Sequence, residues 1–599
     1  MQYPTISEYV KASQDASDNL DMPTEATNAE LNEAITDEWG VKYSKDGRKL
    51  LKAPQELNGT YPIRKGLYGT YSIKEGTKII CDMAFDSCRS LSSLVIPESV
   101  TSIGDCAFRG CRSLTSLVIP ESVVNLNGNP FCGWSGELKC LSPYFIYEDE
   151  VLFNKDKSKI ISCRAQGISS YIIPDSVTSI GDRAFFFCSS LKSLVIPDSV
   201  TSIGDYAFDD CRSLRSLVIP DGITCIGNEA FYDCCSLTDI AIPDSVTSIG
   251  DKAFYRCDSL TSFVIPNGVT SIGDSAFFFC SSLKSLVIPD SVTSIGNSAF
   301  GYCASLTSLV IPEGVTSIGN HAFTVCESLR NIIIPDSVTS IEDGAFCRCK
   351  SLTNLVLPDG VTSIGDSAFS DCWSLTSLVI PEGVTSIGDR AFNGCSSLSS
   401  LVIPDSVTSI GDYAFDGCCS LSSVDLPESV TCIGDRAFRF CNSLSSLVIP
   451  DSVTSIGDGA FGYCNSLSSL VIPAGVTSIG DWAFDGCSSL TSLVIPEGVT
   501  SIGDRAFNGC SSLSSLVIPE GVTSIGDGAF RVCKSLTDIV IPDSVTSIGK
   551  DAFLWCNSLS EIVIPSSVTS IGKKAFGCCN IPTDLKQELS SRFGEEIFW

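Results

Sequence analysis

Proline, phenylalanine and cysteine recur together every 23 residues along most of this chain. The unbroken series runs from Pro174 to Pro565, from Phe185 to Phe576 and from Cys188 to Cys579, and an earlier stretch contains Phe85, Cys88 and Pro97. A fixed period of about 20 to 50 residues is typical of solenoids and repeat arrays. We therefore expect the 599 residues to form one elongated stack that grows by adding coils, in place of several globular domains.

One repeat unit, residues 197–219, shows what each coil contains. Residues 214–219 end in apolar–polar alternation with β-branched side chains, which predicts a short strand that stops at Pro220. Residues 200–203 predict a second extended segment, after which Gly204 turns the chain. Asp205 is placed to cap a helical turn over residues 206–211 by accepting backbone N–H groups.

A single coil of this kind cannot cover its own apolar side chains. In this unit they are Val200, Ile203, Ala207, Phe208, Cys211, Leu214, Leu217 and Ile219. We expect the equivalent side chains of successive coils to lie over one another along one shared interior, with parallel strands about 4.8 Å apart.

The recurring pattern L-x-x-L-x-I-P-x-x-V-x-x-I-x-x-x-A-F-x-x-C resembles the BspA-like (Treponema pallidum-type) class of leucine-rich repeat. The resemblance covers residues of about 73 to 580, and proline with an acid stands where the commoner leucine-rich repeat has Asn or Cys. It implies a repeat solenoid, an α/β leucine-rich-repeat horseshoe of about 20 or more coils with short parallel strands, turns and short helical turns. Many members are surface proteins implicated in adhesion, so the resemblance implies protein partners, including host or extracellular-matrix proteins.

Departures from the repeat suggest the domain organisation. We expect a short helix and acidic linker in residues 1–40, a degenerate N-terminal cap in 41–80, repeats in 81–143, an inserted hairpin in 144–173, repeats in 174–580 and a capping helix in 581–599. Thr5 and Glu8 form a capping-box pattern, and residues 18–38 are acidic without Lys or Arg. In the last segment, Leu585, Leu589 and Phe593 form an amphipathic stripe suited to covering the final coil.

The charge balance limits the classes of partner. A net charge of −30 repels nucleic acid and anionic membrane surfaces, which both require a basic patch. No apolar run reaches the roughly 18 residues of a membrane helix, and the first residues lack a signal-peptide pattern. These features predict no nucleic-acid partner, no membrane insertion and a cytoplasmic location, whereas the family resemblance implies the cell surface or secretion by a non-classical route.

Residues that could carry chemistry have plainer interpretations. The 31 cysteines mostly repeat once per coil, so small buried apolar side chains are favoured over disulfides or zinc ligands. The single histidine, His321, gives no partnered catalytic base. Two acid series, such as Asp198 after proline and Asp205 before the Ala-Phe pair, favour turns and caps over a calcium site or a glycosidase pair. We therefore expect no enzyme activity, no metal and no cofactor.

The repeats differ most around each Ala-Phe pair, while the frame S-L-V-I-P-D-S-V-T-S-I-G-D barely changes. Aromatic and cationic residues that dominate binding hot spots occupy many of these variable positions. The candidate binding residues are Arg183, Phe186, Tyr206, Tyr255, Tyr302, Trp373, Arg390, Tyr413, Trp482, Arg505 and Trp555. Recognition of a protein partner competes here with drift at unconstrained exposed sites.

A second candidate surface is a row of valines that should point outward from the strands. It contains Val95, Val118, Val195, Val218, Val264, Val287 and Val310. A contiguous apolar stripe is typical of an interface, and β-propensity without a partner is the alternative explanation. The sequence thus favours a non-enzymatic binding or adhesion protein, with a self-associating structural solenoid as the alternative and a cation- or glycan-binding surface protein as a weaker one.

Overall fold

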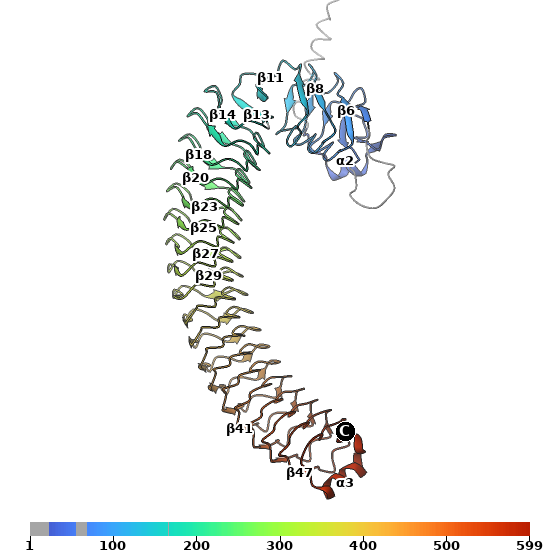
Figure 1. Cartoon of the computed structure of the whole chain (residues 1–599), viewed down its shortest axis with the longest axis vertical. Helices are drawn as coiled ribbons and strands as arrows, with labels where there is room; N and C mark the ends of the chain where they lie inside the picture. The colour runs from blue at the N-terminus through green and yellow to red at the C-terminus, as the bar shows by residue number, and fades with distance from the viewer. Residues whose placement is uncertain (1–22, 55–68, 166) are drawn as a thin grey trace, which may run out of the picture. The chain divides into compact units, whose positions relative to one another are not determined.

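The computed structural model describes residues 23–54, 69–165 and 167–599. The chain divides into two compact units, residues 1–280 and 281–599, each built from stacked coils (Figure 1). The expected repeat solenoid of short parallel strands and turns is confirmed within each unit. The N-terminal capping-box pattern at Thr5 and Glu8 lies outside the described residues.

Most coils contribute two short strands, one of the type Ser-Leu-Val and one of the type Ser-Ile, and in one coil the first type is reduced to isolated bridges at Asn354. In the first unit the Ser-Leu-Val type comprises β4 (Gly69–Ser72), β6 (Leu91–Val95), β8 (Ser116–Ile119), β10 (Glu137–Cys140), β14 (Ser170–Ile172), β16 (Ser193–Val195), β18 (Ser216–Val218), β20 (Asp239–Ala241) and β22 (Ser262–Val264). The Ser-Ile type comprises β5 (Ile79–Ile80), β7 (Ser102–Ile103), β9 (Asn125–Leu126), β15 (Ser179–Ile180), β17 (Ser202–Ile203), β19 (Cys225–Ile226), β21 (Ser248–Ile249) and β23 (Ser271–Ile272).

The second unit continues the same two types of strand. The Ser-Leu-Val type comprises β24 (Ser285–Val287), β26 (Ser308–Val310), β28 (Asn331–Ile333), β31 (Ser377–Val379), β33 (Ser400–Val402), β35 (Ser423–Asp425), β37 (Ser446–Val448), β39 (Ser469–Val471), β41 (Ser492–Val494), β43 (Ser515–Val517), β45 (Asp538–Val540) and β47 (Glu561–Val563). The Ser-Ile type comprises β25 (Ser294–Ile295), β27 (Ser317–Ile318), β29 (Ser340–Ile341), β30 (Ser363–Ile364), β32 (Ser386–Ile387), β34 (Ser409–Ile410), β36 (Cys432–Ile433), β38 (Ser455–Ile456), β40 (Ser478–Ile479), β42 (Ser501–Ile502), β44 (Ser524–Ile525), β46 (Ser547–Ile548) and β48 (Ser570–Ile571).

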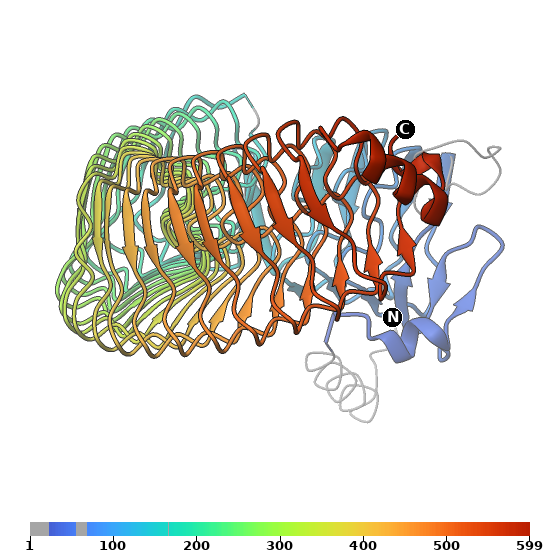
Figure 2. The same cartoon turned by 90° about the horizontal axis from the view of Figure 1, so that it is seen from below.

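Strands of neighbouring coils pair in parallel, and each residue pairs with its equivalent 23 positions later in the next coil. Ile180 of β15 pairs with Ile203 of β17, and Leu470 of β39 pairs with Leu493 of β41. Figure 2 shows the strands of the C-terminal coils side by side. Equal register in every coil places equivalent side chains in columns along each unit.

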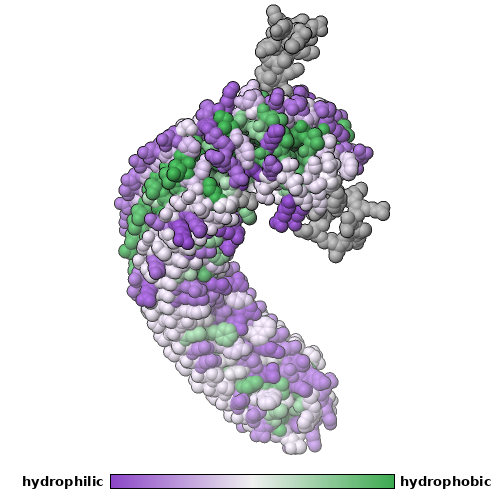
Figure 3. Space-filling view, turned by 45° about the horizontal axis from the view of Figure 1, so that its top comes forward, coloured by the Kyte–Doolittle hydropathy of each residue, from purple (hydrophilic) through white to green (hydrophobic). Residues whose placement is uncertain are grey.

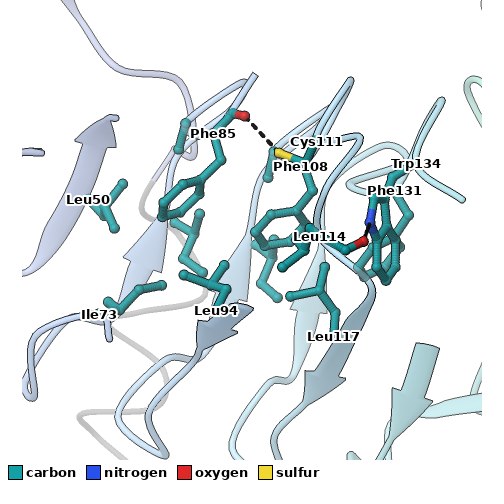
Figure 4. Close-up of a cluster of buried hydrophobic side chains, with 14 of the residues drawn as sticks. Leu50, Ile73, Phe85, Leu94, Phe108, Cys111, Leu114, Leu117, Phe131 and Trp134 are labelled. Carbon is teal, nitrogen blue, oxygen red and sulfur yellow. Dashed lines mark hydrogen bonds between the residues drawn. The ribbon is translucent and has the colours of Figure 1, made fainter. Parts of the chain in front are cut away.

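Phenylalanine forms the central column of the interior. In the second unit the rings from Phe300 to Phe576 stack with centroids 5.2–5.6 Å apart and planes within 10° of each other. In the first unit Phe85, Phe108 and Phe131 stack with centroids 5.8 Å apart (Figure 4). This alignment confirms the expected shared interior.

The column cysteines pack beside these rings and donate hydrogen bonds. Cys111 Sγ lies 3.0 Å from the carbonyl oxygen of Phe85 in the preceding coil (Figure 4), and Cys211 Sγ lies 3.2 Å from that of Phe185. Both thiols are buried and free. The cysteines thus behave as small interior side chains, as expected, and each thiol adds a second hydrogen bond to a phenylalanine carbonyl that already accepts a backbone N–H within its own coil.

The segment around each Ala-Phe pair is a run of turns in place of the expected helical turn. In the coil that holds Phe185, residues Arg183 and Phe187 have φ angles of 55° and 67°, which an α-helix excludes. The N–H groups of residues 183, 185 and 187 donate to carbonyl oxygens of residues 205, 207 and 209 in the next coil. The N–H groups of the residues between them close turns within their own coil. Alternate backbone N–H groups of this segment therefore bond to the next coil, and a continuous helix, which needs all of them within one coil, cannot form.

The aspartate before each Ala-Phe pair joins coils in a similar way. Asp205 Oδ1 accepts the N–H of Asn228, its equivalent in the next coil, at 2.7 Å, and Asp435 does the same for Asp458. The prediction that Asp205 caps a turn of its own coil is therefore wrong, because Asp205 accepts an N–H group of the next coil. The carboxylate points toward the next coil because the N–H groups of the turn that follows it in its own coil, such as those of Tyr206 and Phe208, already donate to other carbonyl oxygens.

The N-terminal region is more ordered than the acidic composition suggested. Helix α2 (Asn28–Asn32) has a capping box between Thr27 and Glu30, and Glu30 also forms an ion pair with Lys49 at 2.8 Å. Three further strands are β1 (Ile35–Thr36), β2 (Lys42–Tyr43) and β3 (Lys49–Lys52). β3 pairs in parallel with β5, so these strands extend the Ser-Ile sheet beyond the first coil.

Residues 145–163 interrupt the coils of the first unit. β11 (Phe145–Glu148) and β12 (Val151–Asn154) are antiparallel, as are β12 and β13 (Lys159–Cys163). β13 then pairs in parallel with β15, which restores the regular ladder. Arg164 lies over the Trp134 ring at 4.2 Å and covers the end of the first phenylalanine column.

The C-terminal end of the second unit is covered by α3 (Thr583–Phe593) and the 3-10 helix η1 (Glu595–Ile597). Leu589 is buried, whereas Leu585 and Phe593 are half-buried. The carbonyl oxygen of Ile597 accepts the N–H of Phe576 at 2.9 Å, and the Phe598 ring packs against Phe576. This segment thus supplies the contacts that a further coil would make.

Candidate functional site

The variable positions of each coil lie on one face, which we call the variable face. It consists of the residue before each Ala-Phe pair, the two residues after that pair and the residue after the recurring cysteine. The first and third positions have positive φ in coil after coil, including those of Arg183, Tyr206, Trp482 and Trp555. Non-glycine residues in this conformation cost about 1–2 kcal/mol each. Bulky side chains occupy these positions although glycine, asparagine or aspartate would suit the backbone better.

In the first unit the variable face brings some candidate residues together. Arg183 lies over the Tyr206 ring at 4.1 Å and forms an ion pair with Asp105 at 2.6 Å. Phe186 is half-buried against Phe187 and is separate from this pair. Arg183 is therefore committed to neighbours within the protein, which makes it a poor contact for a partner.

Tyr255 is the centre of an aromatic row on the same face. Its ring stacks on Tyr232 with centroids 4.7 Å apart and on Phe278 with centroids 5.4 Å apart. Phe279 meets the Tyr255 ring edge-on. Tyr232 and Phe278 were not among the candidate residues, although they occupy the same position of neighbouring repeats as Tyr255 and could have been found by that spacing.

In the second unit the candidate residues lie on the variable face at different exposures. Trp373, Trp482 and Trp555 are 47%, 37% and 49% exposed. Arg390 and Arg505 are exposed, whereas Tyr302 and Tyr413 are half-buried. Arg390 lies over the Tyr413 ring, and Lys350 lies over the Trp373 ring at 4.8 Å. Of these seven residues, Trp482 and Arg505 line one pocket together.

This pocket, which we call the arginine pocket, encloses about 230 Å³. It is lined by Arg436, Arg439, Gly459, Gly462, Tyr463, Trp482, Asp485 and Arg505. Gly459 and Gly462 occupy two variable positions of one coil, so at these two positions the coil presents no side chain between its neighbours, and Tyr463 follows them at the next position. A Cβ atom at Gly459 would lie 3.1 Å from Cγ of Arg436, which shows that the arginine leans across the gap.

Aromatic side chains hold the arginines of this pocket. Arg436 donates a hydrogen bond to the hydroxyl of Tyr413 and lies over its ring. The Arg439 guanidinium lies 4.3 Å from the Phe440 ring centroid and 6.0 Å from that of Tyr463. Within the described part of the chain, neither arginine, nor Arg505, has a carboxylate oxygen within 4.0 Å.

The arginines that line the pocket outnumber its carboxylates, so the net charge of the lining residues is positive. Asp485 is buried in its wall, and its Oδ1 accepts a hydrogen bond from the Asn508 side chain at 2.6 Å. Burial raises the pKa of Asp416 to about 6, and the charges of Arg439 and Arg436 oppose that rise. The candidate binding residues did not include Arg436, Arg439 and Tyr463. The signal that could have found them is the glycine pair at 459 and 462 between coils that carry large residues.

His321 and the aspartate series are the other residues that could carry chemistry. His321 is exposed on the variable face, and the aspartate series joins coils. Among the described residues, no group of three or more His, Cys, Asp or Glu is arranged to hold a metal ion. Within the same residues, no helix combines the length and apolar character needed to cross a membrane.

The stacked coils, with one conserved frame and one variable face, define a leucine-rich-repeat solenoid. A family model described as BspA type leucine rich repeat region matches in six copies, which together cover residues 69–142 and 162–599. The chain belongs to this BspA-type leucine-rich repeat family, as its repeat pattern indicated. No curated protein matches the chain.

Solved structures of similar proteins come from several bacteria. A leucine-rich repeat protein from Bacteroides ovatus is 29% identical, with 71% of this chain and 92% of that chain covered and a TM-score of 0.39. A leucine rich cell surface protein from Faecalibacterium prausnitzii is also 29% identical, with coverage of 70% and 94% and a TM-score of 0.31. The T. pallidum leucine rich repeat protein is 26% identical over 39% of this chain and 88% of that chain, with a TM-score of 0.25.

Proposed function

We propose that this protein is a non-enzymatic binding protein that recognises a protein partner through its variable face. The observation that carries this proposal is the placement of exposed tryptophan and arginine side chains at positions where the backbone favours glycine. Trp482 and Trp555 are 37% and 49% exposed and have φ angles of 54° and 69°, a left-handed conformation that costs a tryptophan about 1–2 kcal/mol. Trp373, which follows Cys372, is 47% exposed on the same face. Their apolar area is available to a partner, as at the centres of binding hot spots.

More specifically, we propose that the protein acts in adhesion. The family resemblance implies host or extracellular-matrix proteins as partners. The regular stacking supports this, because it repeats contact positions along each unit and lets a long partner be bound by many weak contacts.

Capture from a mixture of candidate surface and matrix proteins tests the proposal. The purified full chain is immobilised beside the variant Trp373→Ser/Trp555→Ser, which alters only exposed side chains of the variable face. A matched control, Val379→Ser/Val563→Ser, removes two exposed apolar residues from the strand surface instead. We expect the control to capture the same proteins as the unchanged chain and the tryptophan variant to lose them. Equal capture by all three would contradict recognition through this face.

Self-association through the strand valines is the second candidate. The exposed fractions of Val195, Val218, Val471 and Val517 lie between 52% and 69%, and Ile172 reaches 72%. Figure 3 shows apolar patches on the coils of the first unit around β14 to β20. Serines flank most of these valines, so few charges on this surface would oppose the approach of a second copy.

Sedimentation velocity separates the two candidates. A rise in sedimentation coefficient with concentration, abolished by Val471→Lys/Val517→Lys and kept by Trp373→Ser/Trp555→Ser, would favour self-association. A mass that does not depend on concentration would contradict it.

A further inference from the structure

We infer that the arginine pocket binds a compact anionic group, a carboxylate, sulfate or phosphate, carried on an aromatic stem. This inference deepens the proposed function, because it assigns one ligand chemistry to one place on the variable face. It depends on three features of the pocket: unpaired positive charge, aromatic walls, and a border of negative charge.

The positive charge of the pocket exceeds the negative charge of its walls. Three guanidinium groups line it, and Asp485, the single carboxylate among the lining residues, already accepts a hydrogen bond from Asn508. In a chain with a net charge of −30, acidic residues are abundant, yet none of the described ones forms an ion pair with these arginines. Their N–H donors are available for an anion, to which arginine can bind through two parallel hydrogen bonds.

The arginines are also held in place before a ligand arrives. Tyr413 fixes Arg436 through its hydroxyl and ring, and Phe440 lies under the Arg439 guanidinium. Such contacts restrict the side chains without neutralising them. Binding therefore costs less side-chain entropy than it would at freely moving surface arginines.

The walls of the pocket favour an aromatic stem. Trp482 and Tyr463 are 37% and 38% exposed and both line the pocket. A Cβ atom at Gly486 would lie 2.7 Å from Cδ1 of Tyr463, so this ring lies across the glycine of the next coil. A flat apolar group can pack on these rings while its anion contacts the arginines.

The border of the pocket limits the size of the anion. Asp435, Asp458, Asp481 and Asp504 form a column of carboxylates that accept backbone N–H groups one residue before the first variable position. An extended polyanion that crossed the pocket would approach this column and be repelled. A single compact anionic group avoids the column, which is why we assign that chemistry.

Titration of the full chain with small molecules tests the inference. Benzoate, phenyl sulfate and phenyl phosphate are the anionic probes, inorganic sulfate lacks the stem, and benzyl alcohol lacks the charge. Isothermal titration calorimetry measures affinity, and tryptophan fluorescence, compared with that of Trp482→Phe, shows whether the probe contacts Trp482. We expect at least one aromatic anion to bind at least tenfold more tightly than inorganic sulfate and benzyl alcohol.

Variants place the binding in the pocket. We expect Arg436→Gln/Arg439→Gln to lower the affinity at least tenfold, and Arg505→Gln, an exposed change that leaves the other contacts intact, to lower it severalfold. The matched control Arg330→Gln/Lys534→Gln removes two positive charges elsewhere in the same unit and should bind as the unchanged chain does. Circular dichroism and thermal unfolding confirm that the variants are folded.

Several results would overturn the inference. They are the absence of binding by all three aromatic anions, equal binding of benzyl alcohol, equal binding of inorganic sulfate, and unchanged affinity in both pocket variants. If the small anions fail while partner capture still depends on Trp373 and Trp555, the inference is wrong and the proposed function stands. If the anions bind but no protein is captured through those tryptophans, the proposed function is wrong and the pocket remains.

Discussion

The ring of Phe392 stacks on that of Phe415 with centroids 5.4 Å apart and planes 6° apart, and both rings are fully buried. Each ring therefore contacts a neighbour on both sides, and the column is interrupted wherever one ring is lost. The stability of a solenoid is approximately the sum of the intrinsic stabilities of its coils and the interaction free energies between neighbouring coils. A single substitution in the column consequently weakens two interfaces between coils.

Phe415→Ala should lower the free energy of unfolding of the second unit by about 3–5 kcal/mol, because the cavity cannot be filled by a rigid stack. Hydrogen exchange should speed up first at the amides that join this coil to its neighbours, such as that of Phe415 to the carbonyl of Ala437. Val402→Ala, an exposed change on the strand surface, is the control and should alter stability by less than about 0.5 kcal/mol. Equal effects of the two substitutions would contradict the stacked interior.

Much of this architecture follows from spacing alone. Phe208, Cys211 and Leu214 were predicted to be interior from their recurrence, and Val218 was predicted to be exposed from strand alternation, and the structure agrees. The backbone of the variable face could not be predicted in the same way. Arg183 and Phe187 are residue types that rarely adopt positive φ, and they do so because N–H groups bond to the next coil.

The candidate site was only partly predictable for a related reason. Individual positions such as Trp482 and Arg505 stand out by residue type, but a pocket arises from side chains that lean between coils. Arg436 leans across Gly459, a relationship between residues one repeat apart that requires coordinates. The amino-acid composition of one repeat does not tell in which direction a side chain such as that of Arg436 points.

The C-terminal segment should protect the last coil from fraying and association. Ile597→Ser/Phe598→Ser removes two buried side chains and loosens the carbonyl that accepts the N–H of Phe576. We expect faster hydrogen exchange at Phe576 and concentration-dependent aggregation, because the uncovered interior presents apolar surface. Trp599→Ser, at a residue that is 68% exposed, should change neither measurement. A stable monomer with an unchanged Phe576 amide would argue against a capping role.

Cys106 and Cys132 should form a disulfide under mild oxidation. Their Sγ atoms lie 2.7 Å apart in the buried interior of the first unit, outside the regular cysteine column. Treatment with a small-molecule disulfide would remove two protons and two electrons from the pair and reduce the reagent to thiols. Peptide mapping by mass spectrometry should find this link, while Cys211 and Cys234, which each donate to a backbone carbonyl, stay free. Links of equal yield among column cysteines would refute the prediction.

Asp209 should make the stability of the first unit depend on pH. Burial, reinforced by the neighbouring carboxylates of Asp210, Glu229 and Asp233, raises the pKa of Asp209 from 3.8 to about 8, and Arg183 opposes the rise. The folded state therefore holds a proton that the unfolded state releases between these two values. Stability from this group is fully present below about pH 4 and is lost as pH rises toward 8.

Asp209→Asn removes this dependence while preserving the shape of the side chain. We expect the variant to gain stability relative to the unchanged chain by about 2 kcal/mol or more as pH rises from about 4 to about 8. Denaturant titrations of the full chain across this range, followed by hydrogen exchange in the first unit, measure the difference. Asp198→Asn, at an exposed carboxylate after the repeat proline, is the control and should give a constant difference. A constant difference for Asp209→Asn as well would mean that the Asp209 carboxylate is ionised in the folded protein throughout this range.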